Sequence, residues 1–515
     1  MMGYGQVGHT ADTAPVPGQR TGEAEFNGQL PYSSITGIRY SAANRLYGTA
    51  LGTMRGVNMG NSIKQASVKK WLINFGVVVC FSLAGSVAGP GVSLAAAEKV
   101  KTRVEIDRGT LPADRVQTAI VKVTLDAPAP VLKARRPAVN LCIVLDRSGS
   151  MAGSKLAKAK EAAIEALRRL DQDDMFSVVV YDHNVQTVVQ AQRARHVERI
   201  EAMIRSIRSG GNTALFGGVS QGAAQVRRNL SGDYVHRIIL LSDGIANTGP
   251  SSPADLGRLG ASLLKENISV TTVGVGMDYN EDLMTQLSER SDGNTYFVES
   301  SQDLPRIFAA ELGDVLNVAA RKVKVIIECP GEVKPLRIIG RDGRIRGKQV
   351  ELGLNQLYGN QEKYVLVELE LPPGKEGRQM EVARVNVTYE DPVTKRFETA
   401  SARGVAGFSR DRQKVVRSTN VGVQKEVQLN YSAIAQEQAI DFADEGRTEA
   451  AVQELKKSAL KLKAFGTRHR DAEMLEKAEE MESRAATIKS QGMTPKARKT
   501  LRTDSYQMKH QQKSK

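Results

Sequence analysis

Residues 138–317 alternate between short apolar runs and longer amphipathic stretches, and this alternation constrains the fold more than any other feature. The apolar runs cover residues 139–145, 175–181, 238–241 and 268–275. The amphipathic stretches cover residues 155–169, 194–207, 217–228 and 254–265. Continuously apolar strands that alternate with helices are typical of a mostly parallel sheet covered on both faces. We therefore predict a doubly wound, Rossmann-like α/β domain over residues 138–317.

Oxygen-bearing side chains follow two of these apolar runs. Asp146, Ser148 and Ser150 come directly after the first run, Thr213 follows a Gly-Gly-Asn turn, and Asp243 follows the third run. In open parallel sheets ligands bind at the carboxyl ends of the strands, so we expect these side chains to lie together. A single Asp-x-Ser-x-Ser is usually a turn or a helix cap. Together with the other two groups it predicts one divalent-metal site, because carboxylates and hydroxyls are hard donors that disfavour zinc and copper.

The same pattern resembles a known family. Asp-x-Ser-x-Ser, then Thr, then Asp is similar to the metal-ion-dependent adhesion site of von Willebrand factor type A (VWA) domains, and all five positions match. The resemblance implies that Ser148, Ser150 and Thr213 contact one Mg²⁺ ion, with Mn²⁺ or Ca²⁺ as alternatives. It also implies that Asp146 and Asp243 act largely through waters and hydrogen bonds. The wider layout is similar to bacterial calcium-activated chloride channel homologues and to inter-alpha-trypsin-inhibitor heavy-chain-like proteins.

The segments on either side of the α/β domain have the pattern of β-strands. Residues 98–137 and 318–410 contain short stretches of period-two alternation, separated by Gly, Pro and Asp turns. This pattern predicts a small antiparallel β-sandwich over residues 318–410. We expect the strands of residues 98–137 to pair with it, which would make the α/β domain an insertion. A β-sandwich that simply follows the α/β domain is the alternative.

The first 97 residues suggest export. Residues 1–58 are interpreted as disordered or as a misplaced start. Residues 59–97 contain three lysines, an apolar run and Ala95-Ala96-Ala97, which together predict a signal peptide cleaved near Glu98. A retained N-terminal transmembrane anchor is the alternative, because the apolar run is about long enough to span a bilayer. We therefore expect a periplasmic or secreted protein; N-terminal sequencing would distinguish cleavage from a start upstream of Trp71.

The end of the chain is predicted to be helical and then disordered. Residues 411–490 carry three apolar stripes at helical spacing, which normally face a core. Residues 491–515 are rich in Lys and Arg and hold one acid, Asp504. That composition predicts a solvated tail, with contact to an anionic surface as the alternative.

The remaining composition argues for binding and against catalysis. The net charge of +15 is spread along the chain, and three cysteines cannot make a disulfide framework or a thiolate metal site. The six histidines form no metal-binding pair, and no phosphate loop or nucleophile elbow is present. We therefore expect no enzyme and no nucleic-acid partner. The favoured function is a metal-dependent module that captures a Glu or Asp of a partner protein. The alternatives are a structural component stiffened by the metal and a metal-assisted hydrolase.

Overall fold

A six-stranded sheet forms the centre of the α/β domain in the computed structural model, which describes residues 99–129 and 136–512. The strand order is β6-β5-β4-β7-β8-β9, and all neighbours are parallel except β5 and β6. The strands are β4 (Ala138–Asp146), β5 (Met175–Tyr181), β6 (Val185–Arg193), β7 (Tyr234–Ser242), β8 (Ile268–Val275) and β9 (Thr295–Val298). The expectations for residues 1–58 and 59–97 lie outside the described residues.

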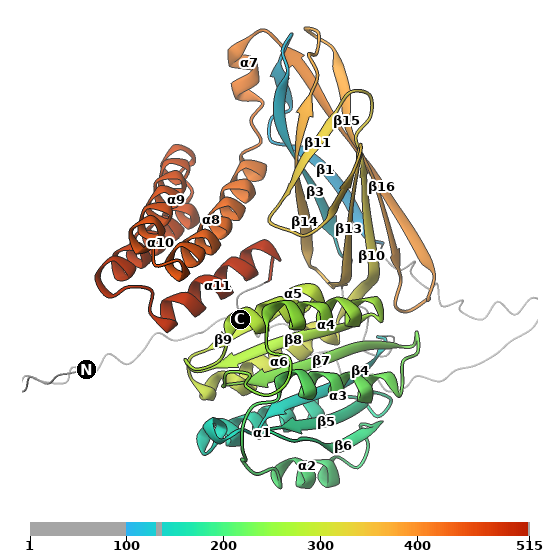
Figure 1. Cartoon of the computed structure of the whole chain (residues 1–515). Helices are drawn as coiled ribbons and strands as arrows, with labels where there is room; N and C mark the ends of the chain where they lie inside the picture. Colours follow the sequence, from blue (N-terminus) through green and yellow to red (C-terminus); the bar gives the residue numbers. More distant parts are fainter. Residues whose placement is uncertain (1–98, 130–135, 513–515) are drawn as a thin grey trace, which may run out of the picture. The chain divides into compact units, whose positions relative to one another are not determined.

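Helices cover both faces of this sheet, as Figure 1 shows. Alternate residues of β4 point to opposite faces, so Leu141 and Ile143 pack with α1, α2 and α6, whereas Cys142 and Val144 pack with α3, α4 and α5. The predicted doubly wound α/β fold is thereby confirmed. The helices are α1 (Ser154–Arg168), α2 (Val197–Arg205), α3 (Leu215–Arg227), α4 (Pro253–Lys265), α5 (Glu281–Arg290) and α6 (Leu304–Val315), with short 3-10 turns η2 (Gly149–Met151) and η3 (Ser301–Asp303).

The strand β6 was not expected from the sequence, because most of its side chains are not buried. Val189 is its only buried residue, so the strand has no continuous apolar run. It pairs antiparallel with β5 at the edge of the sheet, where its other side chains are exposed or half-buried.

The β-domain consists of two sheets whose facing sides share one hydrophobic core. One has the order β1-β3-β14-β11 and the other β12-β13-β10-β15-β16-β2. The neighbours are antiparallel except β16 and β2. The strands are β1 (Lys101–Ile106), β2 (Thr110–Pro112), β3 (Gln117–Asp126), β10 (Val318–Glu328), β11 (Lys334–Ile339), β12 (Arg344–Arg346), β13 (Gln349–Tyr358), β14 (Glu362–Leu371), β15 (Gln379–Glu390) and β16 (Phe397–Ser409).

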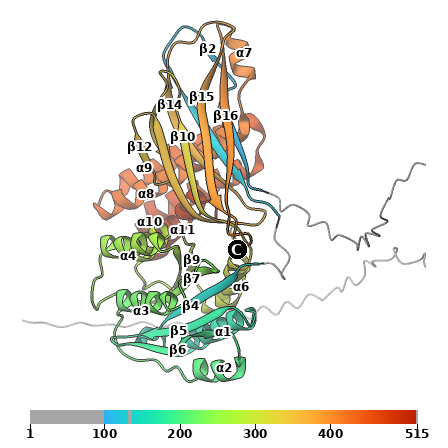
Figure 2. The ribbon, with the colours of Figure 1, turned by 90° about the vertical axis from the view of Figure 1, so that its right-hand side faces the viewer.

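The α/β domain is an insertion between two strands of this β-domain. The strand β3 precedes it in sequence, yet β3 pairs with β14 over ten residue pairs, from Glu362 opposite Asp126 to Leu371 opposite Gln117. Figure 2 shows β10, β15 and β16 side by side in the second sheet. Of the two arrangements left open by the sequence, the structure therefore has the inserted one.

Five helices follow the β-domain in the part of the chain that the structure describes, which ends at residue 512. The three longest are α8, α9 and α10, and buried Ala, Leu, Met and Ile side chains pack them against one another. Within residues 99–129 and 136–512, the helices lack the length of apolar sequence that a bilayer crossing needs. The five helices are α7 (Arg412–Arg417), α8 (Val421–Asp444), α9 (Thr448–His469), α10 (Ala472–Gln491) and α11 (Pro495–Lys509).

The prediction of a disordered basic tail over residues 491–515 is wrong for the part that the structure describes. The helix α11 begins after Thr494, whose hydroxyl accepts a hydrogen bond from the Ala497 amide at 3.2 Å. Leu501 and Tyr506 are buried. Its basic side chains contact acids of the same chain, for example Lys499 with Glu281 at 2.7 Å. Composition alone did not reveal these counter-charges within the chain.

Candidate metal centre

The five predicted ligands lie in three loops at the carboxyl edge of the parallel sheet. Asp146 ends β4 and Asp243 directly follows β7, so the two neighbouring strands bring both carboxylates to one edge. Both carboxylates are completely buried. Ser148 and Ser150 lie around the 3-10 turn η2, and Thr213 precedes α3. The structure thus brings together residues that are up to 97 positions apart.

A continuous hydrogen-bond network joins the two carboxylates to the two serines. Asp146 Oδ1 accepts a hydrogen bond from the Ser148 amide at 2.8 Å, and the hydroxyls of Ser148 and Ser150 lie 3.1 Å apart. The Ser150 hydroxyl donates to Asp243 Oδ1 at 2.8 Å. The other oxygen of Asp146 accepts a hydrogen bond from the Ser242 hydroxyl at 2.7 Å. Asp243 thus orients the Ser150 hydroxyl directly, whereas Asp146 holds the backbone of Ser148.

The three hydroxyls converge on the backbone at Gly244. A Cβ atom at this position would lie 3.1 Å from Thr213 Oγ1, 3.5 Å from Ser150 Oγ and 3.8 Å from Ser148 Oγ. A side chain here would enter the space that the three oxygens surround. The glycine therefore keeps a small cradle of oxygen donors clear, which fits an oxygen-coordinated divalent ion.

Hydrogen bonds from backbone amides hold the three loops against one another. The Thr213 amide donates to the Asn247 side chain at 2.9 Å, and the Asn247 amide donates back to the Thr213 carbonyl at 3.1 Å. The Gly149 amide donates to the Gly211 carbonyl at 3.0 Å. Ser148 and Thr213 are buried, whereas Ser150 is exposed, so the cradle opens to solvent on the side of Ser150.

The two carboxylates have different electrostatic surroundings. Burial raises the pKa of Asp146 above its usual range, although hydrogen bonds from Ser148 and Ser242 oppose this shift. Asp243 instead faces a cation, because Lys155 Nζ lies 2.5 Å from Asp243 Oδ2. An ammonium therefore neutralises one of the two carboxylates and leaves the other with neutral donors.

Three residues of the centre were missed by the sequence reasoning. Ser242 holds Asp146, Asn247 holds the Thr213 loop, and Lys155 pairs with Asp243. Ser242 directly precedes a predicted ligand, and that adjacency could have drawn attention to it. Lys155 and Asn247 had no comparable signal, because only the fold brings them to the site.

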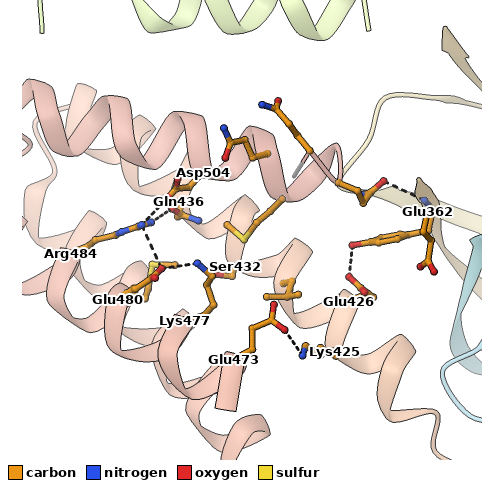
Figure 3. A pocket seen from close by; sticks show the side chains of 17 residues that line it. Glu362, Lys425, Glu426, Ser432, Gln436, Glu473, Lys477, Glu480, Arg484 and Asp504 are labelled. Carbon is orange, nitrogen blue, oxygen red and sulfur yellow. Dashed lines mark hydrogen bonds and ion pairs between the residues drawn. The ribbon is translucent and has the colours of Figure 1, made fainter. Parts of the chain in front are cut away.

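A second candidate, a cavity of about 510 Å³, lies between α8, α10, α11 and β14 (Figure 3). Its basic side chains are already engaged with acids that line the same cavity: Lys425 with Glu473, Lys477 with Glu480, and Arg484 with Asp504. The pairs of Lys425 and Arg484 join neighbouring helices, whereas that of Lys477 lies within α10, and we assign the cavity no ligand. Among the described residues, no three His, Cys, Asp or Glu side chains could hold a metal ion. The hydroxyl-rich cradle is therefore the better candidate.

Comparisons with known proteins identify the α/β domain. Residues 140–310 match the family model of the von Willebrand factor type A domain. Over 270 residues the chain is 27% identical to the Synechocystis sp. protein sll0103. This alignment covers 50% of this chain and 63% of that protein. Over 178 residues it is 32% identical to the Mus musculus inter-alpha-trypsin inhibitor heavy chain H2, covering 32% of this chain and 18% of that protein. The chain thus spans less than two thirds of the length of either relative.

The fold extends beyond this one domain in a solved structure. The "von Willebrand factor type A from Catenulispora acidiphila" is 18% identical, with a TM-score of 0.61. The similarity covers 76% of this chain and 91% of that one. The match is therefore one of fold, and it includes more than the α/β domain alone.

Proposed function

Because residues 140–310 form a VWA domain, a class that commonly serves metal-dependent protein interaction, we propose that this protein is a metal-dependent protein-binding module. One observation carries the proposal: three hydroxyl oxygens converge on Gly244, and two buried carboxylates support them. Oxygen donors of this kind suit Mg²⁺ or Mn²⁺, and Ca²⁺ less well.

In this proposal Ser148, Ser150 and Thr213 hold the ion directly. Asp146 and Asp243 act mainly through hydrogen bonds, which is consistent with the Ser148 and Ser150 contacts that they already make. Neutral hydroxyls leave a bound divalent ion much of its positive charge, so it would supply an electrophilic position for a further oxygen ligand. The solvent side of the cradle is where a partner protein would present a Glu or Asp side chain.

We propose that the protein does not act as an enzyme. The polar groups that contact the cradle are Ser, Thr, Asp, Asn and Lys side chains, and the one amine among them is paired with Asp243. A metal-assisted hydrolase would need a base beside the reacting water. Asp146 and Asp243, the two carboxylates of the cradle, are instead engaged by hydrogen bonds from Ser242 and Ser150. The exported location expected from residues 59–97 belongs to the same proposal, and N-terminal sequencing tests it.

The test compares Asp146→Ala and Asp243→Ala with Asp233→Ala in the full chain. Asp233 is an exposed acid of the same domain, with a side chain that is 79% accessible, so it is the matched control. We expect both site variants to lose at least about tenfold in Mg²⁺ affinity, corresponding to about 1.4 kcal/mol. Their circular dichroism should persist, because the apolar strands form the core. Calorimetry that gave unchanged Mg²⁺ affinity in both site variants would contradict the proposal.

Partner capture separates the binding function from a structural one. A partner isolated from the native envelope fraction should bind in Mg²⁺ and be released by a chelator. If the metal only stiffened the fold, the Asp146→Ala protein would melt at a lower temperature yet still bind that partner. Equal binding with and without chelator would exclude the cradle as the docking site.

A further inference from the structure

The ammonium of Lys155 is built into the candidate metal centre. Lys155 lies in the first turn of α1, directly after Gly153 and Ser154. Gly153 has a φ of +79°, a backbone conformation that favours glycine and that turns the chain into the helix. Lys155 Nζ then lies 2.5 Å from Asp243 Oδ2, and its side chain is 29% exposed. The lysine is thus placed by the loop that carries Ser148 and Ser150.

This contact changes the charge of the cradle. Two carboxylates and one ammonium leave a net charge of −1, where the carboxylates alone would leave −2. Arg147, a cation within one of these loops, is engaged elsewhere, because its Nε lies 3.2 Å from Asp182 Oδ2. Asp146 has neutral donors, the Ser148 amide and the Ser242 hydroxyl. Lys155 is therefore the side chain that sets this balance.

We propose that Lys155 tunes the charge of the centre: its ammonium strengthens binding of the partner carboxylate and weakens binding of the metal ion. The inference rests on the proposed function, since it concerns the same ion and the same partner carboxylate. With Lys155 in place, a bound divalent ion leaves the centre with a net charge of +1. Without Lys155 the loaded centre would be neutral. Lys155 is a positioning residue in this role, because it acts through Asp243.

The two ligands should respond to the loss of this charge in opposite directions. A divalent cation meets a more negative empty centre and binds more tightly, because unlike charges a few ångströms apart attract strongly when partly shielded from water. A carboxylate meets a less positive loaded centre and binds more weakly. A purely structural role for Lys155 would weaken both. The opposite signs therefore distinguish electrostatic tuning from support of the loop.

The experiment titrates the full chain with Mn²⁺ by calorimetry, and then titrates acetate into the Mn²⁺-loaded protein by water proton relaxation. Acetate stands for the carboxylate of the partner. For Lys155→Met we expect Mn²⁺ to bind roughly tenfold tighter and acetate roughly tenfold weaker than in the unaltered chain. Lys155→Arg keeps the charge, so it should retain both affinities to within about threefold.

Lys158→Met is the matched control. Lys158 lies on the same helix, its side chain is equally 29% exposed, and it pairs with Glu161 at 2.8 Å, away from the cradle. It should leave both titrations unchanged. Unaltered Mn²⁺ affinity in Lys155→Met, or weaker binding of both ligands, would overturn the tuning role while leaving the metal site intact. Absence of Mn²⁺ binding in the unaltered chain would overturn the metal site and the tuning role together.

Discussion

At the scale of single residues, Gly244 keeps the cradle clear. An added Cβ would lie 3.1 Å from Thr213 Oγ1, which would have to shift by a few tenths of an ångström, and in ordinary contact with Ser150 Oγ at 3.5 Å. We expect Gly244→Ala to lower Mg²⁺ affinity about tenfold, about 1.4 kcal/mol, because the added methyl group takes up space beside the three donor oxygens. Calorimetry on the full chain measures this loss.

Gly232→Ala provides the comparison for that prediction. A Cβ at Gly232 would have no atom within 4 Å, so the change should leave Mg²⁺ affinity and thermal stability as they are. Equal affinity in the two alanine variants would mean that the space beside Gly244 does not hold the ion.

At the scale of elements, the helix α11 is fastened to α5 by buried ion pairs. Lys499 Nζ lies 2.7 Å from Glu281 Oε2, and both side chains are more than nine-tenths buried. Arg498 also pairs with Glu281, so Lys499→Met removes one of two cations from this buried carboxylate. The loss of this charged hydrogen bond should destabilise the protein by about 2 kcal/mol. Urea unfolding, followed by circular dichroism, measures this loss.

Lys496 is the matched control on the same helix. Its pair with Glu299 is exposed on both sides, at 59% and 57%, and exposed pairs contribute little. Lys496→Met should therefore unfold at the urea concentration of the unaltered chain. If Lys499→Met did so too, the Lys499 pair would contribute little to holding α11. The ion pairs of Arg498 and Arg502 with Asp282, and the apolar contacts of Leu501 and Tyr506, would then hold the helix.

At the scale of the whole molecule, polar side chains connect the inserted α/β domain to the β-domain. Arg237 of β7 is completely buried and donates to Gln356 of β13 at 2.8 Å. The neighbouring His236 is also buried, and its Nε2 lies 3.1 Å from the Ser231 carbonyl. Burial lowers the pKa of His236 to about 4, and the charges of Arg321 and Lys322 in the β-domain add to this shift.

This pKa predicts that the protein loses stability as the pH falls. Well above about pH 6.5 His236 is neutral in both the folded and the unfolded state, so it does not change the free energy of unfolding there. Between about pH 6.5 and 4 His236 is protonated in the unfolded chain but stays neutral in the folded protein, so the free energy of unfolding falls with pH. At pH 5.5 this amounts to roughly 1 kcal/mol relative to pH 7.5. Urea unfolding of the unaltered chain and of His236→Gln at both pH values measures it.

The expected result is a smaller stability loss on acidification in His236→Gln. Some loss should persist, because burial also lowers the pKa of His510 well below its ordinary value. His183 is the control: its side chain is 54% exposed, so His183→Gln should behave like the unaltered chain. An identical loss in His236→Gln would mean that other groups cause the acid sensitivity.

The sequence by itself determined the α/β domain, because its signal is local. Continuous apolar runs predict buried parallel strands, and their carboxyl ends must share one edge of the sheet. That reasoning was enough to name five oxygen donors from Asp146 to Asp243, which the fold does bring together. It failed for β6, where one edge of the sheet meets solvent and the apolar run is absent.

Only the tertiary structure decided the contacts that depend on distant partners. The pairing of β3 with β14, which makes the α/β domain an insertion, joins strands from opposite sides of that domain. The basic composition of α11 predicted a solvated tail until the fold placed Glu281 against Lys499. Lys155 is an ordinary helix lysine in the sequence and becomes part of the candidate metal centre through Asp243. Charge pairing has no sequence periodicity, so its partners are known only once the chain has folded.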